Sequence, residues 1–393
     1  MQRDDVSSHL RDATPRAIYA HIPFCRHKCH YCDFYSVVDR RDRQPAFVDR
    51  MEREVHATRD LASLGQVRTI FVGGGTPTLL DPPLLGRTLQ AIRSLADGTL
   101  EEFTVEANPE TVSREVADTL VASGVHRVSM GCQSFHPEHL KTLERWHDPA
   151  SVPVAVENLR RAGIERVSLD LIFGIPGSTL EDWNRDLEIA LSLAPSHLSC
   201  YGLIFEPGTP LTEKQRLGRI GPVEEELEAE MFEETRRTLA RSGFEHYEIS
   251  NWARPGETCR HNLAYWRNDD WIGIGPAAAG HLGGIRYRQV PKLDEWMSSP
   301  PPAPVVDLEC TSPAVQRGDR WMMGLRLRAG LPRNEVQELL REDRPRRSVV
   351  DRHLEAGRLE WHQDRLRISE HALVLSDLVI TDLVIPDDDP LSP

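Results

Sequence analysis

The chain has 393 residues, of which 39% are hydrophobic and 27% are charged, a balance that is ordinary for a globular protein. Its formal net charge of −14 argues against nucleic acid as the main partner, because phosphate binding requires a basic surface. No apolar run reaches the ~18 residues that a membrane span needs. Seven scattered cysteines and a charged N-terminus without a signal-peptide core predict a reducing, cytoplasmic location and no disulfide framework.

Short apolar, β-branched runs alternate with longer helix-like stretches from residue 17 onward. The candidate strands are residues 17–24, 67–74, 101–108, 126–133, 166–174 and 197–205. The helical patterns lie around residues 45–64, 82–96, 111–123, 137–162, 178–193 and 222–242. Strands and helices that alternate at this spacing indicate βαβ units around a parallel sheet. Six units are too few for a complete eight-fold barrel, so the sequence predicts an α/β fold with a partial (β/α)6 barrel, or alternatively a doubly wound sheet.

The alternation stops after residue 245, and the chain is predicted to divide into five parts. These are a mobile tail (1–16), the barrel (17–245), a connecting segment with a Pro-rich linker (246–305), a C-terminal domain (306–385) and a disordered tail (386–393). In the C-terminal domain, three helices, a hairpin with its turn at Gln363-Asp364 and a last helix are expected near residues 312–328, 333–341, 346–356, 358–369 and 371–384. Helices followed by a short hairpin favour a winged-helix-like domain.

Three of the cysteines, Cys25, Cys29 and Cys32, lie within eight residues directly after the first predicted strand. In barrel-type α/β proteins, the chemistry lies on loops that follow the carboxyl ends of the strands. Three thiolates on one tight loop can each bind one iron of a cubane cluster, which leaves the fourth iron for an exogenous ligand. The alternative is a zinc site, although the second pair of ligands that structural zinc sites usually show is missing. Its fourth ligand would be His21, His27 or His30.

Glycines and polar residues occupy the ends of the later strands. The second strand ends in Gly73-Gly74-Gly75-Thr76-Pro77, where glycines let the backbone approach a ligand and Thr76 adds a hydroxyl. Asp170 interrupts an apolar run, and a buried carboxylate needs a partner or a ligand. The other polar positions of this kind are Glu106, Gln133 and Arg145. Together they predict one shared ligand at this edge of the sheet, with structural ion pairs as the alternative for each residue alone.

The Cys-x3-Cys-x2-Cys spacing, with aromatic Tyr31 before the last cysteine, resembles the signature of the radical S-adenosylmethionine (SAM) family. The resemblance implies a 4Fe-4S cluster on the three cysteines, whose open iron binds the amino and carboxylate groups of SAM. It also implies an electron donor, such as a flavodoxin or ferredoxin, for a reduced cluster that cleaves SAM into methionine and a 5′-deoxyadenosyl radical. The positions that match the family's SAM contacts are Tyr19, Tyr31, Gly74, Gly75, Thr76, Glu106, Gln133, Arg145, Asp170, Gly202 and Ala279.

Residues 17–380 resemble one branch of this family through the segments YAHIPFC, GGGTPT, GCQSF, DLIFGIPG and EPGTPL. That branch contains the oxygen-independent coproporphyrinogen III dehydrogenases and the HemW heme chaperones. The dehydrogenases carry a fourth cysteine where this chain has Phe34, and a longer arm than the sixteen residues that precede its first strand. The resemblance therefore implies a chaperone that binds heme, the cluster and SAM and transfers heme to an acceptor protein. The alternative is a coproporphyrinogen III dehydrogenase of porphyrin biosynthesis.

The segment HNLAYW, residues 261–266, resembles the HNxxYW motif of the heme chaperones. An imidazole is a common proximal ligand of heme iron, and aromatic rings suit the face of a porphyrin. The resemblance implies that His261, Tyr265 and Trp266 bind heme, and the alternative is that His261 is a packed, hydrogen-bonded side chain. No catalytic residue is predicted, and a chaperone is favoured over an enzyme. A zinc-stabilised scaffold without cofactor chemistry is a third alternative.

Overall fold

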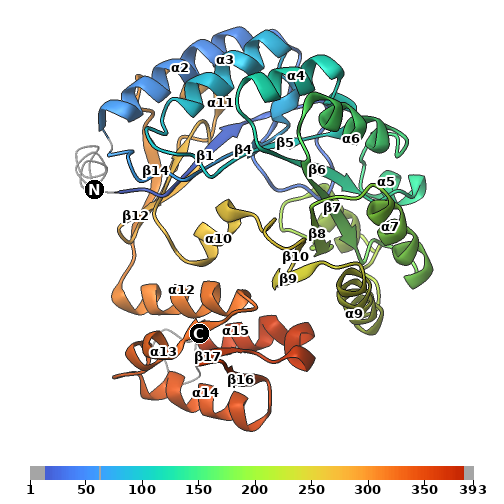
Figure 1. Ribbon diagram of the computed structural model, residues 1–393, viewed down its shortest axis with the longest axis vertical. Helices are drawn as coiled ribbons and strands as arrows, with labels where there is room; N and C mark the ends of the chain where they lie inside the picture. The colour runs from blue at the N-terminus through green and yellow to red at the C-terminus, as the bar shows by residue number, and fades with distance from the viewer. Residues whose placement is uncertain (1–13, 62, 385–393) are drawn as a thin grey trace.

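The structure, a computed structural model, describes residues 14–61 and 63–384, and one large mixed sheet forms its centre (Figure 1). Among these residues the sheet has 12 strands in the order β14-β13-β12-β11-β1-β4-β5-β6-β7-β8-β10-β9. Six strands follow one another in chain order and run parallel: β1 (Ala17–Ile22), β4 (Thr69–Gly74), β5 (Glu102–Ala107), β6 (Arg127–Gln133), β7 (Arg166–Phe173) and β8 (His197–Gly202). These six are the strands that the sequence predicted.

Alternate residues of the parallel strands face two different environments, because successive side chains of a strand point to opposite faces. Ile70 and Val72 of β4 belong to the apolar core, as do Val128 and Met130 of β6. The positions between such core residues are largely polar on the later strands: Glu102, Thr104, Glu106, Arg127, Ser129, Ser168, Asp170, His197 and Ser199. The sheet therefore has an apolar outer face and a polar inner face, which suits a sheet that curves around a ligand site.

A layer of helices follows the outer side of the curved sheet (Figure 1). Its members are α2 (Gln44–Leu61), α3 (Pro82–Arg93), α4 (Arg114–Ala122), α6 (Ser151–Ala162), α7 (Leu180–Ser192) and α9 (Glu225–Arg241). Short helical turns lie in the connections: η1 (Pro77–Leu79), η2 (Pro109–Thr111), α5 (Pro137–Thr142) and α8 (Pro210–Arg216). A doubly wound sheet would carry helices on both faces. The arrangement confirms the partial barrel instead.

Side-chain caps fix where two of these helices begin. Ser113 accepts a hydrogen bond from the backbone N–H of Val116 at the start of α4. Thr179 and Asp182 form a reciprocal capping box at the start of α7. Such caps satisfy backbone donors that the first helical turn leaves without partners. The local sequence therefore determines the residue at which each of these two helices begins.

The sheet continues beyond residue 245, where the sequence predicted that the alternation ends. On one side of the sheet, β10 (Asn251–Ala253) pairs antiparallel with both β8 and β9 (Glu245–Glu248). On the other side, β11 (Trp271–Ile274) pairs parallel with β1. The antiparallel strands that follow are β12 (Ala279–Leu282), β13 (Ile285–Gln289) and β14 (Val305–Cys310). Two short helices, α10 (Arg260–Trp266) and α11 (Leu293–Ser298), lie between these strands. The predicted domain boundary at residue 306 therefore falls inside a strand of the large sheet.

The C-terminal part consists of helices and a small antiparallel sheet in the order β15-β17-β16. Its elements are α12 (Pro313–Arg326), β15 (Leu331–Pro332), α13 (Arg333–Leu339), α14 (Arg344–Glu355), β16 (Leu359–His362), β17 (Arg365–Ile368), η3 (Glu370–Leu375) and α15 (Ser376–Val384). Gln363 and Asp364 both have positive φ between β16 and β17, at the predicted hairpin turn. Trp321 of α12 and Leu383 of α15 are fully buried where these two helices pack.

None of the described helices combines the length and the apolar character that crossing a membrane requires. The tails predicted at residues 1–16 and 386–393 fall largely outside the described residues.

Candidate functional site

A cavity of about 470 Å³ opens at the carboxyl ends of the parallel strands. This volume lies within the range of about 300–1,000 Å³ that is typical of small-molecule sites. Parallel strands end at one edge of a sheet, so residues far apart in the sequence meet there. The predicted positions that line this cavity are Cys25, Cys29, Tyr31, Cys32, Gly74, Gly75, Thr76, Glu106, Gln133, Arg145, Asp170 and Gly202.

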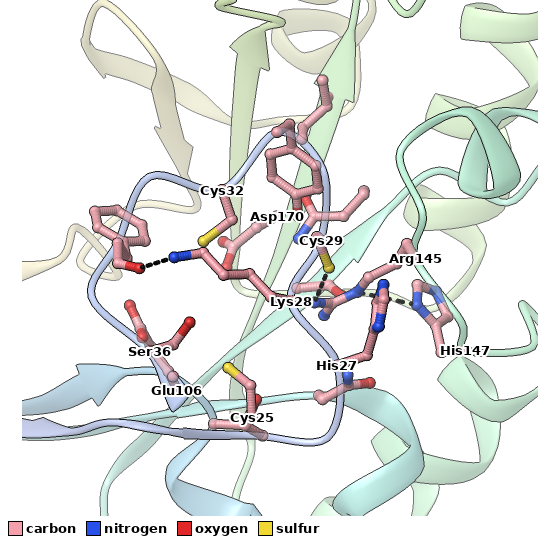
Figure 2. A pocket seen from close by; sticks show the side chains of 18 of the residues that line it. Cys25, His27, Lys28, Cys29, Cys32, Ser36, Glu106, Arg145, His147 and Asp170 are labelled. Atoms are coloured by element: carbon pink, nitrogen blue, oxygen red, sulfur yellow. Dashed lines mark hydrogen bonds between the residues drawn. The ribbon is translucent and has the colours of Figure 1, made fainter. Parts of the chain in front are cut away.

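The loop that carries the three cysteines is closed by a short pair of strands. β2 (Phe24–Cys25) pairs with β3 (Val37–Val38), and the backbone N–H of Asp39 donates to the carbonyl of Cys25 at 2.9 Å. All three sulfur atoms belong to the wall of the same cavity, as Figure 2 shows. We call residues 25–36 the cysteine loop.

Burial makes thiolates costly on the cysteine loop. Burial raises the pKa of Cys32 to about 11, and the neighbouring Cys29 and Cys25 act in the same direction. Burial likewise raises the pKa of Cys25, against hydrogen bonds from Ser36 and Thr76. Thiolates at these positions therefore need a nearby cation, and a bound metal supplies one because metal coordination deprotonates a thiol.

Arg145 brings a buried positive charge to the cavity. Its Nη1 donates to the sulfur of Cys29 at 3.7 Å, and its Nη2 donates to the carbonyl of Gly131 at 2.9 Å (Figure 2). Although burial opposes it, neighbouring Tyr31 and Cys29 raise the pKa of Arg145, so the guanidinium stays charged. A Cβ atom at Gly131 would lie 2.7 Å from Nε2 of Gln133 and 3.0 Å from this guanidinium, so a larger residue there would displace both side chains. The arrangement suits an anionic ligand group.

Glu106 and the glycine-rich turn after β4 form one unit. The backbone N–H of Gly74, which has a φ of 111°, donates to Oε2 of Glu106 at 3.0 Å. A Cβ atom at Gly73 would lie 2.6 Å from the same oxygen, so only glycine fits. Burial raises the pKa of Glu106 to about 7, and the charge of Asp170 adds to this effect. Near neutral pH the carboxyl group can therefore accept a hydrogen bond from a ligand when ionised, or donate one when protonated.

Asp170 lies on β7 without a cation in ion-pair distance among the described residues. Its carboxylate accepts hydrogen bonds from the hydroxyls of Ser129, at 3.0 and 3.1 Å, and Ser168, at 3.3 Å. Burial raises the pKa of Asp170, while the serine hydroxyls and the charge of Arg127 oppose this effect. A carboxylate held by hydroxyls alone is well suited to accept further hydrogen bonds from hydroxyl groups of a ligand.

Two of the predicted positions, Tyr19 and Ala279, are not part of the cavity wall. Tyr19 stacks on Phe71, and its hydroxyl forms a hydrogen bond with Nδ1 of His21 at 2.9 Å. Ala279 lies in β12, and its carbonyl accepts a hydrogen bond from Nε1 of Trp271 at 3.1 Å. Tyr19 lies in β1, and Ala279 lies in β12, which is separated from β1 by β11 in the sheet.

The HNLAYW segment belongs to α10, in which His261 and Ala264 are buried and Tyr265 and Trp266 are partly exposed. Only 1% of His261 is exposed, and its Nδ1 forms a hydrogen bond with the hydroxyl of Thr69 at 3.0 Å. Burial lowers the pKa of His261 to about 4, so its imidazole is neutral. The ring of Tyr265 packs against it, with 4.7 Å between the centroids. Neither His261 nor Tyr265 lines the cavity.

Several residues that the sequence analysis did not single out complete the cavity. Ser129 lines the cavity, and Ser168 lies behind the wall; both hydroxyls hold Asp170, and the alternating patterns RVSMGCQ and RVSLDL contain the signal for them. The outer rim carries the exposed side chains of Trp146, Tyr201 and Ile204. Single exposed apolar residues are common on protein surfaces, so no sequence pattern marked these three.

The chain is similar to known proteins along most of its length. The model of the Radical SAM superfamily matches residues 19–190. The heme chaperone HemW of Lactococcus lactis is 38% identical over 318 residues, which cover 81% of this chain and 83% of that protein. The heme chaperone HemW of Mycobacterium tuberculosis is 35% identical over 381 residues, which cover 94% of this chain and 95% of that protein.

A solved structure shares the fold. The coproporphyrinogen III oxidase (HemN) from Escherichia coli, a radical SAM enzyme, superposes with a TM-score of 0.83 over 98% of this chain and 93% of that one. The two sequences are 19% identical, and at this level the likeness shows the fold alone. The curved sheet and the C-terminal part of this chain therefore occur together in a solved structure as well.

Proposed function

Because the chain belongs to the HemW family of heme chaperones within the radical SAM superfamily, we propose that it binds heme and delivers it to an acceptor protein. The proposal includes a 4Fe-4S cluster on Cys25, Cys29 and Cys32, with SAM bound beside it. One observation carries it: the three thiols and the polar strand ends face a single cavity. When bound, the cluster supplies an electron for reductive cleavage of SAM.

The cysteine loop fits a cubane better than a single zinc ion. Zinc holds its sulfur ligands about 2.3 Å from one centre. Within residues 14–61 and 63–384, no three His, Cys, Asp or Glu side chains are grouped in a way that could hold one ion. A cubane spreads its irons, and each takes a different thiolate. The positions of the three thiols around the cavity wall therefore support the cluster.

The remaining cavity residues would bind SAM by charge and by hydrogen bonding. Arg145 would pair with the carboxylate of SAM, because it is the buried cation of the wall. Asp170 and Glu106 would accept hydrogen bonds from the ribose hydroxyls or the ammonium group. Gly75 and Thr76 would offer backbone groups and a hydroxyl to the methionine end. These groups would orient the cofactor.

The proposal also extends to partners and location. A reduced cluster needs an electron donor such as a flavodoxin or ferredoxin, and a chaperone needs an acceptor for heme. Free thiols that are to bind a cluster suit the reducing cytoplasm. Heme binding by His261, Tyr265 and Trp266 stays a prediction: His261 is buried, whereas Tyr265 and Trp266 are partly exposed.

Two assays on anaerobically reconstituted protein test the proposed function together. Heme titration should shift the Soret band, whereas incubation with coproporphyrinogen III, SAM and a reductant should yield no protoporphyrinogen. The expected lack of turnover rests on Phe34, which replaces the additional cysteine of the dehydrogenases. Robust turnover would favour the dehydrogenase, and protein that contains zinc in place of iron would favour the scaffold.

A further inference from the structure

Exposed apolar side chains gather at the mouth of the cofactor cavity. Twelve large hydrophobic side chains are exposed in the described part of the chain, and four of them line this cavity. Phe34 is 65% exposed, Trp146 62%, Ile204 66% and Tyr201 42%. They come from the cysteine loop, the connection between α5 and α6, and the end of β8, so they surround the mouth from separate elements. We call these four residues the apolar rim.

The apolar rim is held in place by contacts of its neighbours. His27 stacks on Trp146, with 3.8 Å between the ring centroids and 13° between the planes. Nε1 of Trp146 donates to the carboxylate of Glu144 at 3.3 Å. An indole fixed on one face by an imidazole and at its edge by a carboxylate presents a rigid apolar surface to solvent. Large aromatic side chains exposed in this way indicate a binding surface for an apolar partner.

One cation of the rim has no carboxylate partner. Arg26 pairs with Glu110 at 3.0 Å. Lys28, by contrast, contacts only the carbonyl of Phe34, at 3.5 Å, and no carboxylate of the described residues lies within ion-pair distance of its ammonium group. Figure 2 shows Lys28 extending across the cysteine loop, past Cys32. Beside Phe34 the apolar rim thus has a positive charge without a carboxylate partner, which also acts on the thiol of Cys32, although Glu206 adds a negative charge to the wall of the same cavity.

We propose that the porphyrin ring of heme docks flat across the mouth of the cavity, on the apolar rim, with a propionate at Lys28. The proposal rests on the proposed function and assigns a place to its ligand. Heme combines a flat apolar ring with two negative propionates, and the rim offers aromatic surface and one unpaired cation. The cluster and SAM would occupy the interior, so a ring on the rim closes the cavity above them.

Iron-free protoporphyrin IX is the probe that separates this site from an iron-ligand site. Docking through the ring face and a propionate does not need iron, so protoporphyrin IX should bind the reconstituted protein and compete with heme. Trp146→Ala combined with Phe34→Ala should weaken this binding about tenfold or more. Lys28→Ala should weaken it several-fold, and Lys28→Arg should restore it. The matched controls are Trp361→Ala, an exposed tryptophan of β16, and Lys292→Ala, an exposed lysine outside the cavity.

A second readout depends on the position of the ring. A porphyrin across the mouth should slow the dissociation of SAM from the wild-type protein and leave the rate unchanged in the Trp146→Ala, Phe34→Ala double variant. Equal porphyrin affinity in the double variant and the Trp361→Ala control would overturn the site. A requirement for iron in porphyrin binding would overturn it too. If the wild-type protein binds neither heme nor protoporphyrin IX, the proposed function itself fails.

Discussion

Two buried carboxylates face the cavity from β5 and β7, and neither has a cationic partner within ion-pair distance among the described residues. Glu106 is held by the amide of Gly74, and Asp170 by the hydroxyls of Ser129 and Ser168. An unpaired buried carboxylate is unfavourable unless it serves a ligand. Asp170→Ala and Glu106→Ala should therefore keep the cluster and lower SAM affinity about tenfold to a hundredfold, since a hydrogen bond to a charged group contributes about 1.5–3 kcal/mol.

Calorimetric titration of SAM into the reconstituted variants checks this prediction. Gln133→Ala should cause a smaller loss, because its amide is neutral, and Glu188→Ala on the exposed face of α7 is the control. Equal affinities for the wild-type protein and both carboxylate variants would contradict the placement of SAM.

The raised pKa of Glu106 also predicts a dependence of stability on pH. Burial raises this pKa from 4.5 to about 7, so the folded state holds the proton more tightly than the unfolded state. The stabilisation by the bound proton is complete below pH 4.5 and is lost as the pH rises towards 7. This shift in pKa corresponds to about 3 kcal/mol. The free energy of unfolding of Glu106→Gln, measured relative to that of the wild-type protein, should therefore be about 2–3 kcal/mol higher at pH 8 than at pH 5.

Urea unfolding of cluster-free protein at the two pH values measures this gain. Glu188→Gln is the matched control and should show no change with pH relative to the wild-type protein. Parallel pH profiles for the wild-type protein and Glu106→Gln would show that Glu106 is not the group responsible.

Helix α10 is tied to the sheet by one buried side chain at its start. The carboxylate of Glu102, which is fully buried in β5, accepts hydrogen bonds from the backbone amides of Arg260 and His261 at 3.2 and 3.1 Å. It also pairs with Arg166 at 3.3 Å. Arg166 keeps its second partner, Glu257, at 2.6 Å. Glu102→Ala should lower the free energy of unfolding by about 2–4 kcal/mol, because it leaves the two amides at the start of α10 without their acceptor.

The neighbouring residue provides a control for this prediction. Glu101 is exposed and pairs with Arg260 and Arg68 at the surface, so Glu101→Ala should change the free energy of unfolding by less than about 1 kcal/mol. Chemical unfolding of both variants measures the difference. Similar losses in the two variants would contradict the role of Glu102 in holding α10.

The cysteine loop lies outside the packed sheet, so its chemistry and the fold should be separable. Cys29→Ala should lose the cluster and keep the far-ultraviolet circular dichroism of the wild-type protein, because the loop is anchored by β2 and β3 rather than by its thiols. Iron and sulfide analysis measures the loss, and Cys310→Ala in β14 is the control. Full iron content in variants of all three cysteines of the loop would refute the cluster assignment.

At the scale of the whole molecule, the six parallel strands and the cavity edge could be predicted from the sequence. Apolar runs and strand-end residues such as Asp170 are local signals, and parallel strands bring them to one edge. The strands that extend the large sheet beyond residue 245 could not be predicted, because β11, for example, is four residues long and its partner β1 lies some 250 residues away. The hydrogen bonds of His261 are formed with Thr69 and Glu102, which lie 192 and 159 residues away in the sequence. The apolar rim could not be predicted either, because its residues come from separate segments that only the fold brings together.

Heme binding by the protein with its cluster in place is the property on which the proposed function depends. It can be measured by titrating heme into anaerobically reconstituted protein that contains SAM and following the Soret band. We expect a saturable Soret shift that ends at about one heme per chain. Absence of a shift, or a linear increase without saturation, would contradict it.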